Sequence, residues 1–229
     1  MLHSVTCRPE PVEGQVYAKV NSACMINTII FDLGAVLIDW NPHYLYQTIF
    51  EDEAERHTFL NTVCTPAWNE EQDGGRSLQE ATDLLLTQFP EHETAIRAFY
   101  GRWTEMLGGP IQGTVDIFSE LKATGQLKFY ALTNWSSETF PIAQAQYEFL
   151  NWFDGIVVSG EEKDRKPFAS FYNTLLTRYG VEPAEALFID DNLRNVKAAE
   201  ALGIHSVHFT SPDALRTELI QHGLLPAAV

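Results

Sequence analysis

The sequence predicts an α/β fold, in which a parallel sheet with helices on both faces is interrupted by an all-helical block. Two apolar runs without alternation, residues 28–31 and 186–189, are typical of buried parallel strands. From residue 113 onward, helical and strand patterns alternate, which is the pattern of βαβ units. Between the first strand and this alternating part, residues 43–109 show helical spacing throughout.

The N-terminal half is expected to contain one strand and the helical block. The strand at 28–31 ends at an acid, and an apolar segment follows that turns at Asn41-Pro42. Within the block, Ser77 and Glu80 resemble a capping box at a helix start. The block ends at residues 108–110, Gly-Gly-Pro, which we interpret as a hinge.

The C-terminal half is expected to supply most of the sheet. Helices are predicted at 115–123, about 138–149, 168–179, 196–202 and 213–222. Strands are predicted at 128–133, 155–159, 186–190 and 204–209. In such a sheet, ligands bind at the carboxyl ends of the strands.

The charge balance limits the classes of partner. Lys and Arg total 15 against 31 Asp and Glu, a formal charge of -16. We therefore expect neither nucleic acid nor an anionic membrane as a partner, because both bind basic surfaces. A small phosphorylated molecule is compatible with this charge, since a metal ion and one local lysine can override the global field.

The cysteines and the N-terminal segment indicate the compartment. Three scattered cysteines, Cys7, Cys24 and Cys64, form no disulfide framework or zinc motif, so we expect a cytoplasmic protein. Residues 1–24 lack an apolar signal-peptide core and are predicted to be a disordered tail. Met25 directly precedes the first strand, and we expect it to be the true start.

Seven residues that could act on a phosphate or hold a metal lie at or just after the carboxyl ends of the predicted strands. They are Asp32, Gly34, Thr133, Asn134, Lys166, Asp190 and Asp191. Converging carboxylates repel one another, so they require a cation. Oxygen ligands suit Mg²⁺, which binds one or two carboxylates together with substrate phosphate. A hydroxyl and an ammonium would hold the phosphate, and one carboxylate is left to attack phosphorus.

The order and spacing of these residues resemble the phosphatase branch of the haloacid dehalogenase-like (HAD) hydrolase superfamily. Four motifs within about residues 26–225 carry the resemblance: Phe31-Asp32-Leu33-Gly34-Ala35-Val36-Leu37, Leu132-Thr133-Asn134, Arg165-Lys166-Pro167 and Phe188-Ile189-Asp190-Asp191-Asn192. The resemblance implies a Rossmann-like core domain of residues 25–41 and 110–229. The helical block, residues 42–109, looks like the small all-helical cap domain of this superfamily, inserted after the first motif.

The resemblance also implies roles for the site residues. Asp32 is the nucleophile, which forms an aspartyl-phosphate, and Lys166 bridges it to the phosphoryl group. Thr133, Asn134 and Lys166 bind the phosphoryl group, and Asn134 and Asn195 form hydrogen bonds within the site. The implied Mg²⁺ ligands are Asp32, the carbonyl of Gly34 and Asp191, with Asp190 in support. The implied activity is that of a Mg²⁺-dependent phosphatase of a small phosphorylated metabolite.

Gly34 departs from the pattern of most HAD phosphatases. Those members carry a second Asp two residues after the nucleophile, which protonates the leaving oxygen and then activates water. Its loss removes a contribution of about 10²–10⁴ in rate. Some subgroups share this Gly and resemble phosphatases, including ones that act on sugar 1-phosphates. We therefore expect substrates whose leaving groups need little protonation, such as anomeric or acyl phosphates.

Three alternatives remain open. A 2-haloacid dehalogenase also uses an Asp nucleophile, but its last motif lacks paired acids, so Asp190 and Asp191 favour the phosphatase. A non-catalytic binding module of the same fold would not need Asp32, Thr133, Lys166, Asp190 and Asp191 together, so this set favours an enzyme. A mutase generally keeps the Asp that Gly34 replaces. We interpret Trp40, Trp68 and Trp135 as aromatic side chains of the core or of the cap interface. The sequence pattern gives no prediction of the oligomeric state.

Overall fold

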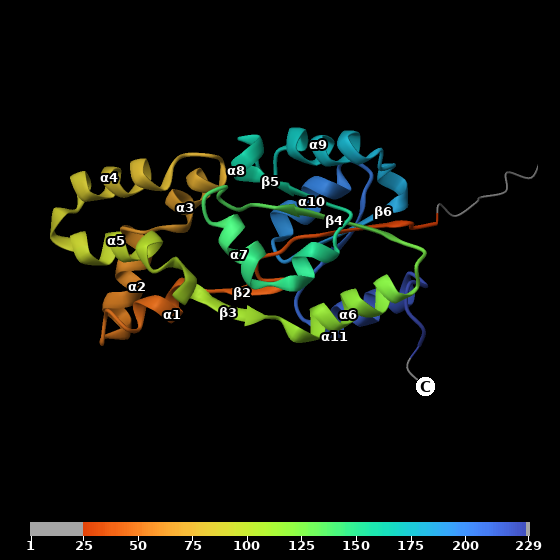
Figure 1. The fold of residues 1–229 in the computed structure, drawn as a ribbon, viewed down its shortest axis with the longest axis horizontal. Helices are drawn as coiled ribbons and strands as arrows, with labels where there is room; N and C mark the ends of the chain where they lie inside the picture. The colour runs from red at the N-terminus through yellow and green to blue at the C-terminus, as the bar shows by residue number, and fades with distance from the viewer. Residues whose placement is uncertain (1–24, 228–229) are drawn as a thin grey trace, which may run out of the picture.

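The computed structural model describes residues 25–227 and arranges the strands of that part in two sheets (Figure 1). The larger sheet has five parallel strands in the order β5-β4-β1-β6-β7. They are β1 (Thr28–Phe31), β4 (Lys128–Thr133), β5 (Gly155–Val158), β6 (Ala186–Asp190) and β7 (His205–His208). The predicted α/β fold is confirmed. The predicted tail, residues 1–24, lies outside the described residues.

Both faces of the large sheet are covered, as the continuous apolar runs predict. Ile29 and Phe31 belong to the apolar cluster under α6 and α11, and Ile30 to the cluster under α9 and α10. In Figure 1, α6 and α11 lie below the sheet and α9 above it. These helices are α6 (Gln112–Ala123), α9 (Ala169–Tyr179), α10 (Leu193–Glu200) and α11 (Pro212–Gln221).

The second sheet corrects one prediction. Leu107–Pro110 forms β3, which pairs antiparallel with β2 (Ile38–Trp40), whereas the sequence pattern predicts helix for residues 107–109. Glycine is a poor helix former, and Gly109 has φ +105, a conformation that favours glycine over other residues. The backbone of the Gly-Gly-Pro segment therefore pairs with β2, and the two strands join the large sheet to the helices.

The helical region, defined as residues 42–106, lies at one end of the large sheet (Figure 1). It contains α1 (Pro42–Tyr46), α2 (Glu53–Thr62), α3 (Pro66–Asp73), α4 (Leu78–Gln88) and α5 (Glu93–Gly101), with 3-10 turns at Pro90–His92 and Trp103–Met106. Ser77 caps α4 by accepting the Glu80 N–H, as predicted. Buried Tyr46 contacts Phe59 and Phe99, so aromatic side chains form the centre of this region.

The remaining segments differ from the predictions in detail. The helix predicted at about 138–149 is shorter: α7 (Phe140–Gln146) ends at Tyr147, whose backbone is extended, and a 3-10 turn (Glu148–Trp152) follows. A short helix, α8 (Ser159–Glu162), begins where the sequence pattern predicts the end of a strand, and a further 3-10 turn (Pro183–Glu185) precedes β6.

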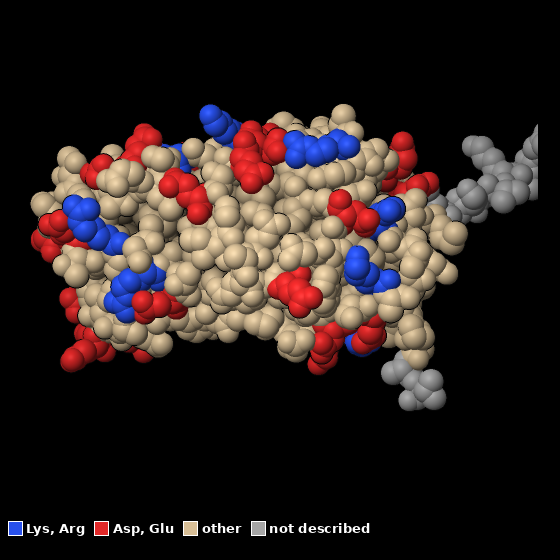
Figure 2. Space-filling view, in the orientation of Figure 1, with Lys and Arg blue, Asp and Glu red and all other residues tan. Residues whose placement is uncertain are grey.

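The surface carries mixed charge. On the face drawn in Figure 2, acidic and basic side chains are interspersed around an uncharged middle area. None of the helices between residues 25 and 227 is long and apolar enough to cross a membrane.

Tyr46 offers a test of packing in the helical region. Its hydroxyl donates to the carbonyl of Ala95 at 2.9 Å, which ties α1 to α5. We expect Tyr46→Phe to lower the free energy of unfolding by about 1 kcal/mol, because one buried hydrogen bond is lost. Urea denaturation measures this loss. Tyr44→Phe is the control, since the Tyr44 hydroxyl bonds Asp39 at an exposed position, and it should change stability by less than about 0.5 kcal/mol. Equal effects of the two variants would contradict the prediction.

Candidate active site

Asp32 lies at the carboxyl end of β1, the central strand of the large sheet. The four residues of β1 are all buried, and Asp32 itself is only 8% exposed. Its Oδ1 accepts the N–H of Leu33 at 2.7 Å and faces the Nζ of Lys166 at 2.8 Å. Both contacts use Oδ1, so Oδ2 has no partner among the described residues. One carboxylate oxygen is thus held while the other is left for a ligand.

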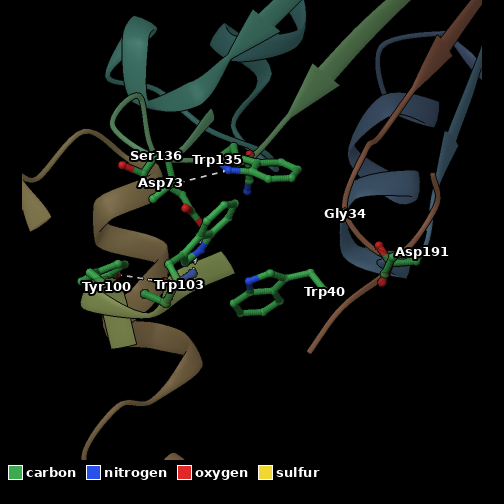
Figure 3. A pocket seen from close by; sticks show the side chains of 12 residues that line it. Gly34, Trp40, Asp73, Tyr100, Trp103, Trp135, Ser136 and Asp191 are labelled. Carbon is green, nitrogen blue, oxygen red and sulfur yellow. Dashed lines mark hydrogen bonds between the residues drawn. The ribbon is translucent and has the colours of Figure 1, made fainter. Parts of the chain in front are cut away.

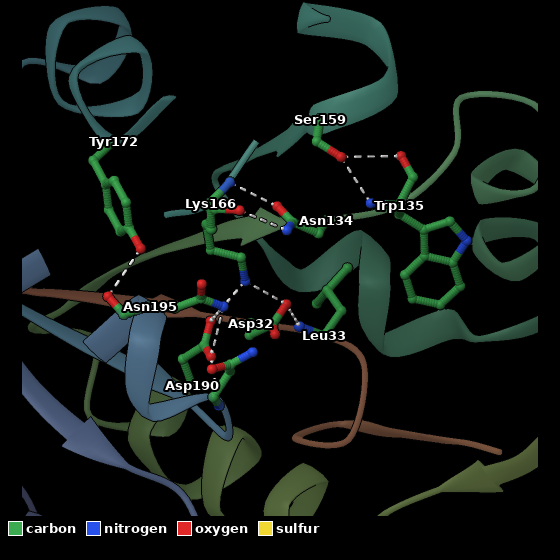
Figure 4. Close-up of polar contacts among 10 residues, drawn as sticks. Asp32, Leu33, Asn134, Trp135, Ser159, Lys166, Tyr172, Asp190 and Asn195 are labelled. Atoms are coloured by element: carbon green, nitrogen blue, oxygen red, sulfur yellow. Dashed lines mark hydrogen bonds and ion pairs between the residues drawn. The ribbon is translucent and has the colours of Figure 1, made fainter. Parts of the chain in front are cut away.

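Lys166 is a fully buried cation between two carboxylates (Figure 4). Its Nζ lies 2.8 Å from Asp32 Oδ1 and 2.7 Å from Asp190 Oδ2. Burial disfavours the charged ammonium, but the charges of Asp190 and Asp32 outweigh this and raise the pKa of Lys166. The pKa of Asp32 is also raised, mainly by burial, although Lys166 opposes the rise. The lysine therefore remains charged and offsets the negative charge of the site.

Asn134 holds the backbone beside Lys166. Its Oδ1 accepts the Lys166 N–H at 2.8 Å, and its Nδ2 donates to the Lys166 carbonyl at 3.0 Å. Both polar atoms of the Asn134 amide are therefore hydrogen-bonded to the backbone of the loop that carries Lys166. The structure brings Asn134 into the site as a residue that positions Lys166.

Asp190 is fully buried at the end of β6 and is fixed from several sides. Its Oδ1 accepts the Asn192 N–H at 2.8 Å and the Asn195 Nδ2 at 3.0 Å, while Oδ2 faces Lys166. The Asn195 carbonyl accepts the Tyr172 hydroxyl at 2.9 Å. These bonds orient Asp190, and the predicted place of Asn195 within the site agrees with them.

Three carboxylates converge at this edge of the sheet. Oxygen atoms of Asp32, Asp190 and Asp191 lie within 4.8 Å of one another. Asp191 is the exposed member, and its pKa is raised by partial burial and by Asp190. Three acids beside one lysine leave excess negative charge, which a divalent cation would offset. The oxygen donors fit Mg²⁺.

Thr133 lies at the end of β4 with a fully buried side chain. Its Oγ1 is buried and has no hydrogen-bond partner within residues 25–227. An unpaired buried hydroxyl costs roughly 1–3 kcal/mol of stability. A bound phosphate oxygen would remove this cost, which fits the role that the sequence predicts for Thr133.

Two cavities border these residues. The first, about 210 Å³, is lined by Gly34, Asp191, Asp73 and four aromatic side chains, and Figure 3 shows Asp73, Tyr100 and Trp103 across from Gly34 and Asp191. The aromatic side chains are Trp40, Tyr100, Trp103 and Trp135. The second cavity, about 360 Å³, is bordered by Asp32, Asp73, Asn134 and Asp191. The acids thus open onto space that the helical region helps to enclose.

The predicted role of the tryptophans is correct for Trp68 and incomplete for the other two. Trp68 packs on Phe99 in the helical core and donates its Nε1–H to the Ala81 carbonyl. Trp135 contacts Trp103 of the helical region, as expected of an interface aromatic, but it also lines the first cavity with Trp40. Sequence spacing could not reveal this, because the cavity forms only when distant segments meet.

A family model described as a haloacid dehalogenase-like hydrolase matches residues 26–203. The chain belongs to this family. The four motifs named above lie within the matched segment, and the protein is a hydrolase. The acid cluster, the buried lysine and the unpaired Thr133 all lie within the matched segment.

Known proteins share the sequence or the fold of this HAD hydrolase. A protein of Aspergillus oryzae named as a sesquiterpene phosphatase is 32% identical over 194 residues, covering 84% of this chain and 94% of that protein. A HAD family enzyme from Bacteroides thetaiotaomicron, solved with magnesium and inorganic phosphate, has a TM-score of 0.59 at 20% identity over 81% of this chain and 95% of its own. L-2-haloacid dehalogenase from Xanthobacter autotrophicus has a TM-score of 0.57 at 20% identity, with 88% and 85% covered. Both of these solved structures share the fold of this chain.

The ion pairs of Lys166 predict a large stability effect. We expect Lys166→Met to lower the free energy of unfolding by about 3–5 kcal/mol in EDTA, because Asp32 and Asp190 lose the cation between them. Urea denaturation at neutral pH measures the loss. Lys197→Met, at an exposed position of α10, is the control and should change stability by less than about 0.5 kcal/mol. A Lys166→Met variant as stable as the control would show that the buried pairs contribute nothing.

Proposed function

We propose that this HAD hydrolase is a Mg²⁺-dependent phosphatase that hydrolyses a small phosphorylated metabolite through an aspartyl-phosphate on Asp32. The observation that carries the proposal is the cluster of three carboxylates around one buried lysine, next to an unpaired threonine hydroxyl. The relative named as a phosphatase supports the reaction. The HAD enzyme of the same fold that was solved with magnesium and phosphate supports the cofactor.

The proposed reaction assigns a role to each residue. Oδ2 of Asp32 attacks phosphorus, and the bond from phosphorus to the leaving oxygen breaks. Lys166 and Thr133 hold the phosphoryl oxygens by charge and by a hydrogen bond. Water then hydrolyses the aspartyl-phosphate and restores the carboxylate.

Asp32, Asp191 and the Gly34 carbonyl would hold Mg²⁺, with Asp190 in support. When bound, the ion supplies positive charge that lets the anionic nucleophile and the phosphate approach each other. The helical region is proposed to act as the cap, which excludes water and selects the substrate. The buried, free thiol of Cys64 suits the reducing cytoplasm that we propose as the location.

The aromatic cavity indicates an apolar alcohol as the leaving part of the substrate. Trp40, Tyr100, Trp103 and Trp135 line the space next to the acids. Aromatic walls bind apolar groups by removing their surface from water. The relative named as a sesquiterpene phosphatase supports the same choice. A sesquiterpenyl monophosphate is therefore the first substrate to test, beside sugar 1-phosphates.

Phosphate release with Mg²⁺ and with EDTA tests the reaction. We expect Asp32→Asn to reduce turnover by about 10⁴–10⁶-fold, because it removes the nucleophile. Asp116→Asn, at an exposed position of α6, should leave turnover unchanged. Full activity of Asp32→Asn would overturn the mechanism. Chloride release from a 2-chloro acid in EDTA would instead favour the dehalogenase, the alternative that shares the fold.

Substrate preference tests the cavity. We expect Trp40→Ala to lower kcat/KM for a sesquiterpenyl monophosphate by about 10–100-fold, the effect of losing one buried apolar contact. The loss for glycerol phosphate should be much smaller, since that alcohol does not fill the cavity. Trp152→Ala is the matched control, because Trp152 packs on Phe118 outside both cavities. Equal losses on both substrates would argue against an apolar binding site.

A further inference from the structure

Gly34 leaves this phosphatase without a proton donor next to the nucleophile, yet the structure holds another acid on the opposite wall of the cavity. We propose that Asp73, the last residue of α3, is the general acid and base of the reaction. This assignment rests on the proposed function, since it names the proton donor of that same site. It is a catalytic residue supplied by the helical region rather than by the sheet.

The position of Asp73 is the first argument. Asp73 lines both cavities, together with Gly34 and Asp191 in one and with Asp32 in the other. Figure 3 shows Asp73 on the helical side, facing the wall that carries Gly34 and Asp191. A phosphate ester with its phosphorus at Asp32 must extend its leaving oxygen into this shared space. Asp73 is thus placed on the leaving-group side.

A chain of hydrogen bonds orients the Asp73 carboxyl group. Asn69 Nδ2 donates to Asp73 Oδ2 at 3.3 Å, and Asn69 Oδ1 accepts the Tyr100 hydroxyl at 3.0 Å. The same hydroxyl accepts Gln72 Nε2 at 2.8 Å. General acid catalysis requires such a fixed position. Two ion pairs at 3.0 Å, Arg165 with Glu71 and Arg194 with Glu70, join α3 to the loop of Lys166 and to α10.

The surroundings of Asp73 favour its proton-carrying form. Asp73 stands at the C-terminus of α3, where the helix dipole disfavours negative charge. Burial raises the pKa of Asp73 to about 7, and Glu70 adds to the rise, while Arg165, Lys166 and the Ser136 N–H oppose it. The other charged groups that border the two cavities are Asp32, Asp191, Glu70 and Arg194. A carboxyl that titrates near neutral pH can both donate and accept a proton.

Asp73 gives up one proton and takes one back in each reaction cycle. As Asp32 bonds to phosphorus, the bond to the alcohol oxygen breaks and that oxygen takes the proton of Asp73. The Asp73 carboxylate then takes a proton from water, whose oxygen attacks phosphorus. The bond between phosphorus and Asp32 breaks, which frees the phosphate and returns Asp73 to its protonated form. With this donor, alkyl phosphates become substrates as well as the easier anomeric or acyl phosphates.

The test compares two leaving groups in Asp73→Asn. For an alkyl monophosphate, we expect a loss of about 10²–10⁴-fold in kcat/KM, because the alkoxide needs a proton to depart. For p-nitrophenyl phosphate, whose leaving group departs as a stable anion, the first turnover should keep nearly the wild-type rate in a rapid-quench measurement. Wild-type kcat/KM for the alkyl substrate should fall above about pH 7 as Asp73 loses its proton, and Asp73→Asn should lack this fall.

Gly34 provides a rescue variant. A Cβ at residue 34 would meet no atom within 4 Å, and the residue borders the same cavity as Asp73. Gly34→Asp introduced into Asp73→Asn should restore at least about tenfold of the lost alkyl-phosphate activity, since it supplies a carboxyl from the other wall. Asp83→Asn, at an exposed position of α4, is the control and should behave as wild type.

The outcomes separate this assignment from the proposed function. Alkyl-phosphate turnover of Asp73→Asn within about threefold of wild type would overturn the assignment of Asp73 alone. An equal loss in the first turnover of both substrates would also overturn it, because that result indicates a structural role. Failure of the wild-type protein to release phosphate from either substrate with Mg²⁺ would overturn the proposed phosphatase function itself.

Discussion

The placement of one ammonium group between two carboxylates constrains the rest of this structure. Lys166 lies far along the chain from Asp32, and both side chains are removed from bulk water. Charges in such a position are tolerated only when their partners are fixed within hydrogen-bond distance. The adjacency of β1 and β6 places Asp32 and Asp190 side by side, and Asn134 holds the backbone of the lysine. The order of the strands, the conformation of the loop that carries Lys166 and the charges of the site therefore depend on one another.

The proposed function divides the site into polar residues that act on the phosphate and aromatic residues that contact the alcohol. The strand ends supply charge: three acids, one lysine and one hydroxyl, a set that can act on a phosphate whatever alcohol is attached to it. The helical region supplies Tyr100 and Trp103 of the aromatic lining of the first cavity, and Trp40 and Trp135 come from outside it. In the proposed function, these aromatic side chains select the alcohol while the polar residues act on the phosphate, so substrate choice can vary while the phosphoryl chemistry is kept.

The sequence predicts the parts of the site that depend on local patterns. Apolar strands that end in polar residues are visible in a single stretch of chain, so Asp32, Thr133, Asp190 and Asp191 can be identified from the sequence alone. β3 cannot, because Leu107–Pro110 becomes a strand only through its pairing with β2. Asp73 is one of several acids in the stretch Glu70-Glu71-Gln72-Asp73. Only Asp73 of these three acids borders both cavities, since Glu70 borders the second alone and Glu71 neither, and both glutamates pair with arginines.

The ion pair between Arg165 and Glu71 joins the loop that carries Lys166 to α3. Arg165 is the neighbour of Lys166, so a single loop contacts both Asp32 and α3. In the proposed mechanism, undocking of α3 would leave Asp32 in place but take Asp73 away, so that phosphate esters would bind without being cleaved. Cleavage would then require α3 to be docked over the bound alcohol. Such a molecule would discriminate among substrates by rate in addition to affinity, and water that enters an open site would find no base to activate it.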